Sequence, residues 1–281
     1  MTIKIVTDST CDLPANIIQE LGISVIPLKV LFGEEVYRDG IDLTNKEFYE
    51  KMAKHKKLPT TSQVNPGEFI EEFTRHIDNG DEVIGIFISA KLSGTYGSAV
   101  IAKETMANDS RINIIDSLSA SFGLGIQVIE AGRMIQEGKS AQEIVRRIEE
   151  IKNGVHFYGV INTLENLKKG GRLSSSGAFA GSLLGIKPII TLRDGAVALI
   201  AKARGQKKAF NWVLEDAKKN NIDLNNKTIC LAHASAPEGA AEFKKEILKD
   251  YQPKEIIELQ IGAVIGTHTG GGCVGISCLP D

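Results

Sequence analysis

Short runs of β-branched and other apolar residues alternate along the chain with amphipathic stretches. This alternation is typical of an α/β fold with a largely parallel sheet. The runs are almost continuously apolar, as expected for strands that helices cover on both faces. The predicted strands are Ile3–Thr7, Val83–Ser89, Ile112–Ile115, Phe157–Ile161, Thr228–Leu231 and Ile256–Leu259.

Capping residues mark the starts of helices between these runs. Thr44 and Glu47 have the spacing of a capping box, in which two side chains bond each other's free backbone N–H groups. Asn65 before Pro66 supplies a cap and a preset first helical residue. Residues 23–42 interrupt the alternation, and we expect them to form an irregular β insertion.

The pattern changes after about Asn153. Two alternating strands in the second half are joined by Asp194–Gly195, a dipeptide typical of tight hairpin turns. An antiparallel hairpin inside a second α/β unit predicts a separate C-terminal domain. We therefore expect an N-terminal α/β domain over residues 1–153 and a C-terminal α/β domain over residues 154–281.

Composition narrows the classes of function. The 281 residues carry a formal net charge of -2, which argues against nucleic acid as the main partner because phosphate binding needs a concentrated basic surface. No apolar run approaches the ~20 residues that cross a bilayer, so we expect no stable membrane insertion. The N-terminus does not have the architecture of a signal peptide. The cysteines are scattered, which favours a reducing cytoplasm and indicates neither a disulfide scaffold nor a metal site.

The segment SAKLSGTYGSA, Ser89–Ala99, follows a predicted strand and opens a helix near Thr95. Hydroxyls and free backbone N–H groups at a helix N-terminus bind anions well. Ser93 alone is equally compatible with a simple helix cap. The density of hydroxyls in this segment exceeds what one cap requires, so it is a candidate anion site.

Two further segments are candidates on weaker grounds. Thr61 and Ser62 precede a capped helix, where an ordinary loop is the simpler interpretation. His268 lies in the glycine-rich stretch Gly262–Gly275, and glycine lets the backbone approach a ligand closely. A lone histidine is more often structural, but this setting just after a predicted strand favours a site.

Arg172 follows a glycine pair and precedes a run of serines at the proposed domain junction. A charge cluster of this kind is usually a solvated turn, but ligand clefts tend to form at such junctions. Residues 138–140 resemble the end of a phosphate-binding loop, but the required first glycine is absent and a helix precedes them. No G-x-S-x-G nucleophile motif occurs.

Taken together, these segments resemble the DegV family of bacterial lipid-binding proteins. The resemblance covers nearly the whole chain and is carried by the TDST opening, Thr61-Ser62-Gln63, LSGTYGSA, Asp116-Ser117, LKKGGRLS, IKPII, ARGQKKA and the closing G-x-H-x-G turn. It implies two α/β domains with a fatty acid bound in a tunnel between them, and no cofactor. Some members are the acyl-carrying subunit of a fatty-acid kinase, which present the carboxylate to a separate ATP-dependent kinase; the acyl phosphate enters phospholipid synthesis.

The resemblance also implies roles for single residues. The family's carboxylate-holding hydroxyls fall on Thr61 and Ser93, and its histidine falls on His268. The arginine beside the glycine pair falls on Arg172, and the arginine implicated in kinase docking falls on Arg204.

Further donors to the carboxylate are expected from Ser62 and from the backbone N–H groups of Gly94 and Thr95. The chain departs from the family in one place, because the turn after the histidine commonly reads G-P-G and here is Gly270–Gly272. We expect this to loosen the backbone near the head group. Candidates for the lining of the acyl tail, for which plain core packing is an equal alternative, are Phe179, Leu183, Leu184 and Ile186.

Two other functions stay open at this point. One is a serine hydrolase with Ser93 as nucleophile and His268 as base, although no carboxylate is clearly placed to orient the histidine. The other is a carrier of a different amphiphile, without any kinase.

Overall fold

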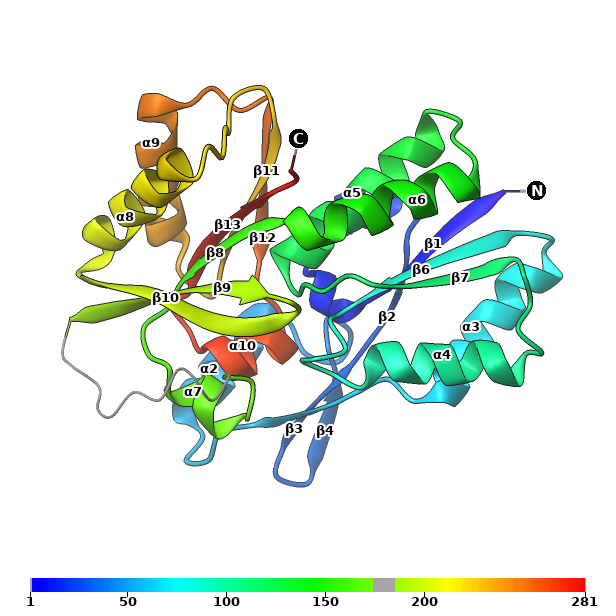
Figure 1. Ribbon diagram of the computed structural model, residues 1–281. Coiled ribbons are helices and arrows are strands. Elements are labelled where there is room, and N and C mark those ends of the chain that lie inside the picture. The colour runs from blue at the N-terminus through cyan, green and yellow to red at the C-terminus, as the bar shows by residue number, and fades with distance from the viewer. Residues whose placement is uncertain (1, 174–184, 281) are drawn as a thin grey trace.

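The computed structural model describes residues 2–173 and 185–280, and within them the strands form three sheets (Figure 1). The first sheet is fully parallel. Its order is β2 (Ser24–Ile26), β1 (Ile3–Asp8), β6 (Glu82–Phe87) and β7 (Ile112–Asp116). The predicted parallel sheet of the N-terminal half is therefore confirmed.

Helices cover both faces of this sheet. On one face lie α3 (Pro66–Asp78) and α4 (Thr95–Thr105), and on the other lie α5 (Phe122–Gln136) and α6 (Ala141–Ile151). The short helices η1 (Ser9–Cys11) and α1 (Ala15–Leu21) pack against α5. This double cover explains why the strands are apolar along their whole length.

The second sheet has the order β10 (Ala196–Arg204), β9 (Ile186–Arg193), β8 (His156–Val160), β13 (Val274–Cys278), β11 (Thr228–His233) and β12 (Glu255–Gln260). Its pairs are antiparallel except β11 with β12. The hairpin between β9 and β10 turns at Asp194 and Gly195, whose φ angles of 49° and 78° are both positive, as a two-residue turn of this kind needs. The predicted hairpin is confirmed.

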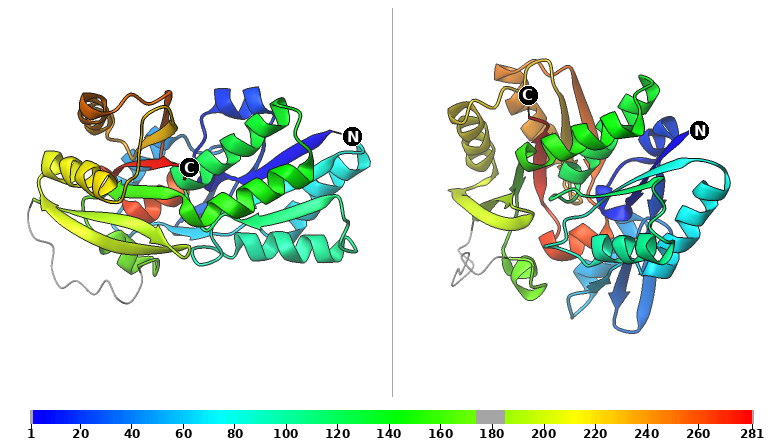
Figure 2. Two further views of the ribbon diagram at one scale, coloured as in Figure 1. Left: turned by 45° about the horizontal axis from the view of Figure 1, so that its top comes forward. Right: turned by 45° about the vertical axis from the view of Figure 1, so that its right-hand side comes forward.

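Helix α5 is shared between the two sheets. It packs on β1 and β6 of the first sheet and on β11 and β13 of the second, and the views of Figures 1 and 2 place it between the two units. Its buried residues surround the helix instead of forming one stripe, which is typical of a helix enclosed by protein. Helices α8 (Gln206–Lys219) and α9 (Pro237–Asp250) pack against the second sheet.

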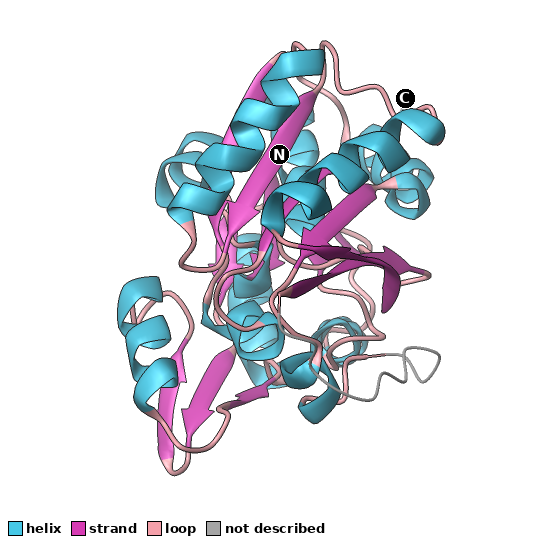
Figure 3. Cartoon of the chain, turned by 90° about the vertical axis from the view of Figure 1, so that its left-hand side faces the viewer, coloured by secondary structure: helices cyan, strands magenta, loops and turns pink. Residues whose placement is uncertain are grey.

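The third sheet is small and antiparallel, with the order β4 (Glu35–Arg38), β3 (Lys29–Phe32) and β5 (Thr60–Ser62). Helix α2 (Asn45–Lys54) and helix α10 (Ala263–Thr269), the latter from the far end of the chain, pack against each other beside it. Helices and strands occur in every part of the molecule, as the α/β class requires (Figure 3).

The stretch that we expected to be an irregular β insertion divides in two. Ser24–Ile26 is β2 and belongs to the parallel core sheet, because it pairs with β1. The remainder forms the regular β3–β4 hairpin, which turns at Gly33 with a positive φ of 66°. A β insertion outside the parallel sheet is therefore present, but its hairpin is regular and Ser24–Ile26 belongs to the core sheet. Strands this short do not show a clear period in the sequence.

The glycine-rich stretch near the C-terminus is a helix followed by a turn and a strand. Our prediction described it as a glycine turn, whereas α10 occupies its first half and β13 its end. The sequence AVIGTHT of α10 contains one glycine and four β-branched residues, which are poor helix formers, so local pattern does not reveal it. The predicted capping box at Thr44 and the cap at Asn65 are both present.

Two short elements flank the middle of the chain, η2 (Lys152–Gly154) before β8 and α7 (Glu165–Lys169) after it. Among the described residues, no helix has both the length and the apolar character needed to cross a membrane.

Candidate ligand-binding site

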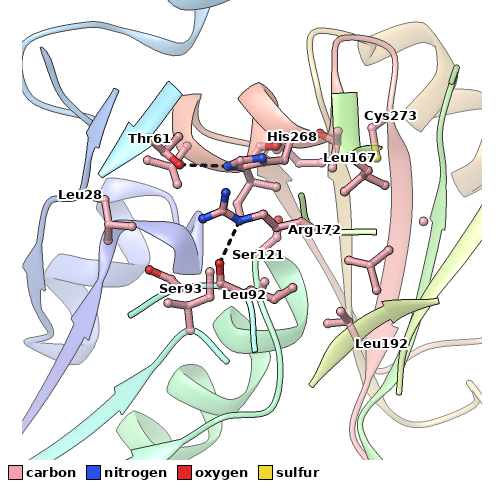
Figure 4. Close-up of a pocket in the computed structure, with 18 of the residues that line it drawn as sticks. Leu28, Thr61, Leu92, Ser93, Ser121, Leu167, Arg172, Leu192, His268 and Cys273 are labelled. Carbon is pink, nitrogen blue, oxygen red and sulfur yellow. Dashed lines mark hydrogen bonds between the residues drawn. The ribbon is translucent and has the colours of Figure 1, made fainter. Parts of the chain in front are cut away.

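A cavity of about 270 Å³ lies between the two larger sheets, close to the lower end of ordinary small-molecule sites at about 300 Å³. Its walls come from both halves of the chain (Figure 4). One part is apolar and includes Phe122, Phe157, Ile190, Leu192 and Val197. The aromatic rings of Phe122 and Phe157 stack with centroids 4.2 Å apart. The opposite part carries hydroxyls, an imidazole and a guanidinium group.

His268 and Thr61 meet at this polar part. Thr61 lies on β5 and His268 on the last turn of α10, and the His268 Nε2 atom is 2.9 Å from Thr61 Oγ1. Burial, and secondly the positive charge of Arg172, lower the pKa of His268 to about 4. The imidazole is therefore neutral at pH 7.

Close approach of His268 to the chain after α7 requires a glycine. A Cβ atom added at Gly170 would overlap His268 Nδ1. That nitrogen is buried and has no hydrogen-bond partner among the described residues. The imidazole of His268 is thus held between the Thr61 hydroxyl, to which it is hydrogen-bonded, and the backbone at Gly170, against which it packs.

Ser93 lies in the loop between β6 and α4. Its Oγ atom is 2.9 Å from Thr95 Oγ1 and accepts a weak bond of 3.3 Å from the Thr95 backbone N–H. Gly94 occupies the cap position of α4 and has no side chain to cap it. Ser93 therefore supports the helix start and also borders the cavity, so the two interpretations of the sequence are compatible.

Arg172 connects the two halves of the chain beside the cavity. Its Nε donates to the Leu92 carbonyl at 3.1 Å and its Nη1 donates to the Gly170 carbonyl at 2.6 Å. Figure 4 shows the guanidinium group between His268 and Ser93. A positive charge at this position favours an anion in the polar part of the cavity.

The predicted site residues do not all lie at the cavity. Those that border it are Thr61, Ser62, Ser93, Gly94, Arg172 and His268. Ser62 has an exposed side chain, whose hydroxyl contacts the Gln63 carbonyl at 3.5 Å. Thr95 is fully buried and is not among the described residues that line the cavity.

Arg204 is exposed at the end of β10, outside the described cavity wall. Of the expected tail-lining residues, Phe179, Leu183 and Leu184 lie outside the described residues. Ile186 is described, at the start of β9, but it is not among the described lining residues.

Gln63 and Ser121 are among the cavity residues that were not predicted. Gln63 donates from Nε2 to Ser98 Oγ at 2.9 Å, and its side chain fills the space that a Cβ at Gly94 would take. Ser121 lines the cavity at the start of α5 with φ 52° and ψ -134°, a backbone conformation rare outside glycine. Gln63 stands in the motif Thr61-Ser62-Gln63 but was given no role there, and no motif marks Ser121.

The turn Gly270–Gly272 is fastened more firmly than we expected from its glycines. The Asn162 side chain donates to the Gly271 carbonyl at 2.9 Å, and the Gly272 N–H donates to the Ala234 carbonyl at 2.7 Å. A side chain at Gly272, where φ is 84°, would overlap Asn162. Hydrogen bonds thus replace the stiffness that a proline would add.

In the part of the chain that the structure describes, no group of three or more His, Cys, Asp or Glu side chains has a geometry that holds a metal ion.

The profile of the family described as "Uncharacterised protein, DegV family" matches residues 2–281 of this chain. A DegV domain-containing protein from Caldanaerobacter subterraneus is 39% identical over 274 residues, which cover 98% of this chain and 97% of the relative.

Solved structures of DegV family proteins are also similar to this chain. A DegV family protein from Thermus thermophilus, described by its fatty acid binding, has a TM-score of 0.92 and 33% identity, with 99% of each chain covered. A stearic-acid-binding protein from Eubacterium ventriosum has a TM-score of 0.91 and 30% identity, with 99% of this chain and 98% of that chain covered.

Proposed function

The chain belongs to the DegV family, and on that premise we propose that it binds one long-chain fatty acid in the cavity and presents the carboxylate to a separate kinase. The observation that carries this proposal is the division of one cavity into an apolar wall and a polar end. At the polar end, polar side chains from β5, α10, the loop before α4 and the segment after α7 converge. Related proteins of known structure are described as binding fatty acids.

The apolar wall supplies most of the affinity for such a ligand. Each buried methylene contributes about 0.8 kcal/mol, so ~14 methylenes contribute on the order of 11 kcal/mol before the costs of association. Tight binding therefore needs no covalent bond. The carboxylate sets the orientation, because a buried charge is very costly unless it is bonded.

The tautomer of the neutral His268 determines whether the Thr61 hydroxyl can donate a hydrogen bond to that carboxylate. A protonated Nδ1 would be a buried donor with no partner among the described residues, whereas unpaired buried N–H groups are rare. We therefore assign the proton to Nε2, which donates to Thr61 Oγ1. The Thr61 hydroxyl is then free to donate to the ligand. The Ser93 hydroxyl is free to do so when Thr95 Oγ1 is the donor of the bond between them, while Arg172 contributes positive charge.

In this proposal the chain holds the acid and another protein performs the chemistry. A carboxylate oxygen attacks the γ-phosphorus of ATP, so that an acyl phosphate forms and ADP leaves. The exposed Arg204 at the end of β10 is the proposed contact with the kinase. The four cysteines are buried as thiols in the described chain and not joined as disulfides, which supports a reducing cytoplasm as the place of action.

The geometry disfavours the hydrolase alternative. A serine nucleophile needs a hydrogen bond to its base, and the base needs an orienting group. Ser93 bonds Thr95, whereas His268 bonds Thr61. Among the described residues His268 Nδ1 has no carboxylate partner. Labelling of Ser93 by a fluorophosphonate probe would contradict the carrier proposal.

A reconstituted kinase reaction tests the proposed presentation. The protein loaded with palmitate is mixed with ATP and a bacterial fatty-acid kinase subunit, and acyl phosphate is trapped with hydroxylamine. We expect Ser93→Ala to reduce acyl phosphate formation strongly with little change in thermal stability. We expect Arg204→Ala to reduce it while palmitate affinity stays unchanged, and Lys249→Ala, on the far helix α9, to leave both unchanged. Palmitate binding without any acyl phosphate would favour a carrier that has no kinase.

A further inference from the structure

The start of α10 is held at three consecutive residues, 261–263, by side chains from the N-terminal half of the chain. Tyr49 Oη donates to the carbonyl of the first residue at 2.9 Å. Asp12 Oδ1 accepts from the N–H of the second at 2.9 Å, and Asp39 Oδ1 accepts from the N–H of the third at 3.0 Å. Tyr49, Asp12 and Asp39 therefore form a socket for the start of α10, although α10 follows them by more than 200 residues in the sequence.

The two carboxylates of the socket are unusual because they are buried together. Asp12 is 9% exposed and Asp39 is 5% exposed. Apart from the helix N–H groups, the Ser121 hydroxyl donates to Asp12 and the Ser9 side chain bonds Asp39. Burial raises the pKa of Asp39 to about 6 and raises the pKa of Asp12, to which the charge of Asp39 also contributes. Buried carboxylates are costly, and here each one is bonded to the first turn of α10.

The contact leaves no spare room. A Cβ atom at Gly262 would lie 2.8 Å from Asp12 Oδ1, and one at Gly266 would lie 2.5 Å from Tyr49 Oη. On its other side, Asp12 holds Ser121, which keeps a strained backbone and lines the cavity. Asp12 thus ties the starts of α5 and α10 together at the cavity.

A short helix transmits any tilt at its start to its end. Helix α10 has seven residues and carries His268 on its last turn, where the imidazole meets Thr61. We propose that Asp12 and Asp39 are positioning residues, which fix the orientation of α10 and thereby hold His268 against the hydroxyl of Thr61. The proposal rests on the proposed function, in which Thr61 binds the carboxylate of the ligand. Neither aspartate is among the described lining residues of the cavity, and no hydrogen bond joins either to the imidazole.

Asp8 is the matched control, because it is a buried carboxylate of the same region whose hydrogen bonds go to Thr10 and Ile88 and not to α10. It is 0% exposed and accepts from the Thr10 N–H at 3.0 Å and the Ile88 N–H at 2.8 Å. Other titratable groups close to Asp12 are Cys11 and Cys273, and Arg172 is the charged group close to His268. A general change of charge in this region would affect the Asp8 variant as well.

The test is ¹⁵N NMR of the imidazole of His268 in the ligand-free full-length protein, with the signal assigned by the His268→Gln variant. In the wild type we expect one neutral tautomer, protonated at Nε2, and a pKa far below 6.5. In Asp12→Asn and Asp39→Asn we expect mixed tautomers and a rise in that pKa of about one unit or more, because water reaches the loosened ring. In Asp8→Asn we expect the wild-type spectrum.

Gly262→Ala is a second test that keeps both carboxylates and separates the helix from Asp12 by one methyl group. We expect it to give the same mixed tautomers and the same rise in the pKa of His268. This variant tests the positioning role if the aspartate variants do not fold. Folded Asp12→Asn, Asp39→Asn or Gly262→Ala protein with an unchanged His268 spectrum would overturn the inference. So would an equal change in Asp8→Asn.

Ligand titration keeps this inference separate from the proposed function. The folded variants are expected to lose about ten-fold in affinity for palmitate and clearly less for 1-hexadecanol, because only the head group is affected. An equal loss for both ligands would indicate a merely structural role. If the wild type binds no palmitate, the proposed function fails while the histidine spectra still decide the positioning role.

Discussion

The Thr61 hydroxyl is the residue-scale link between His268 and the proposed carboxylate. As the acceptor of the Nε2 proton it is left with its own proton to donate, which a valine in its place lacks. Its neighbour Thr60 points to the other side of β5 and is exposed. The two threonines therefore provide a matched pair of substitutions on one strand.

We predict that Thr61→Val weakens palmitate binding by about 1.5–3 kcal/mol, the usual value of a hydrogen bond to a charged group, or roughly 10- to 150-fold in Kd. Thr60→Val should leave the Kd unchanged. Isothermal titration of delipidated protein measures both. Equal affinities for the wild type and Thr61→Val would remove Thr61 from the head-group site.

The pKa of His268 predicts how stability depends on pH. Its folded value of about 4 lies below the ordinary 6.5, so on acidification the unfolded chain takes up the proton first. The contribution of His268 to the free energy of unfolding should therefore fall between pH 6.5 and 4, by at most about 1.4 kcal/mol per pH unit. Above pH 6.5 the group has no effect.

Chemical denaturation at several pH values checks this dependence. The variant His268→Gln should lose less stability than the wild type between pH 6.5 and 4, whereas a variant of the exposed His55, His55→Gln, should follow the wild type. Asp8, Asp12 and Asp39 have pKa values that burial raises, so they oppose this effect, but their contribution is common to all three proteins and cancels. Parallel curves for His268→Gln and the wild type would show that the imidazole titrates normally in the folded protein.

At the scale of single residues, the sequence indicated the hydroxyls and basic groups of the site but not the residues that hold them in position. Ser93, Thr61 and Arg172 stand in segments whose composition or family resemblance marks them, and they border the cavity. Their roles toward a ligand stay predictions. Asp12 and Asp39 resemble ordinary turn residues in the sequence, because their partners on α10 are more than 200 positions away.

At the scale of elements, the site depends on short pieces that tertiary contacts create. Strand β5 has three residues and pairs with β3, and α10 has seven residues of poor helix propensity. Long elements such as α3 and β6 follow from periodicity and caps, so they were predicted. The short ones hold Thr61 and His268, so the pairing of these two residues could not be read from local sequence.

The packing of α10 against the segment after α7 gives a prediction about Gly170. Its φ is ordinary for a helix end at -76°, so alanine is tolerated by the backbone. The added methyl group would overlap His268, and overpacking of this kind costs about 1–3 kcal/mol in a packed core. We expect Gly170→Ala to displace the imidazole and to weaken palmitate binding by up to that amount. Gly97→Ala is the control, because a Cβ there meets no atom within 4 Å. Unchanged binding in Gly170→Ala would mean that the imidazole is free to move.

At the scale of the whole molecule, the cavity exists because two sheets share one helix. The larger hydrophobic core extends from Ile5 of the first sheet to Leu259 of the second, and a separate core is confined to the C-terminal half. The strands of the two larger sheets divide near residue 153, but α5 and α10 pack across that point. The boundary therefore remains a proposal, and the two halves are expected to unfold together.

We expect the protein to keep its ligand during purification, because an enclosed apolar tail leaves slowly. Organic extraction and mass spectrometry of protein purified from bacterial cells test this most directly. We expect about one long-chain fatty acid per chain, and much less from the Thr61→Val variant. A preparation that contains no fatty acid and also fails to bind added palmitate would contradict the account.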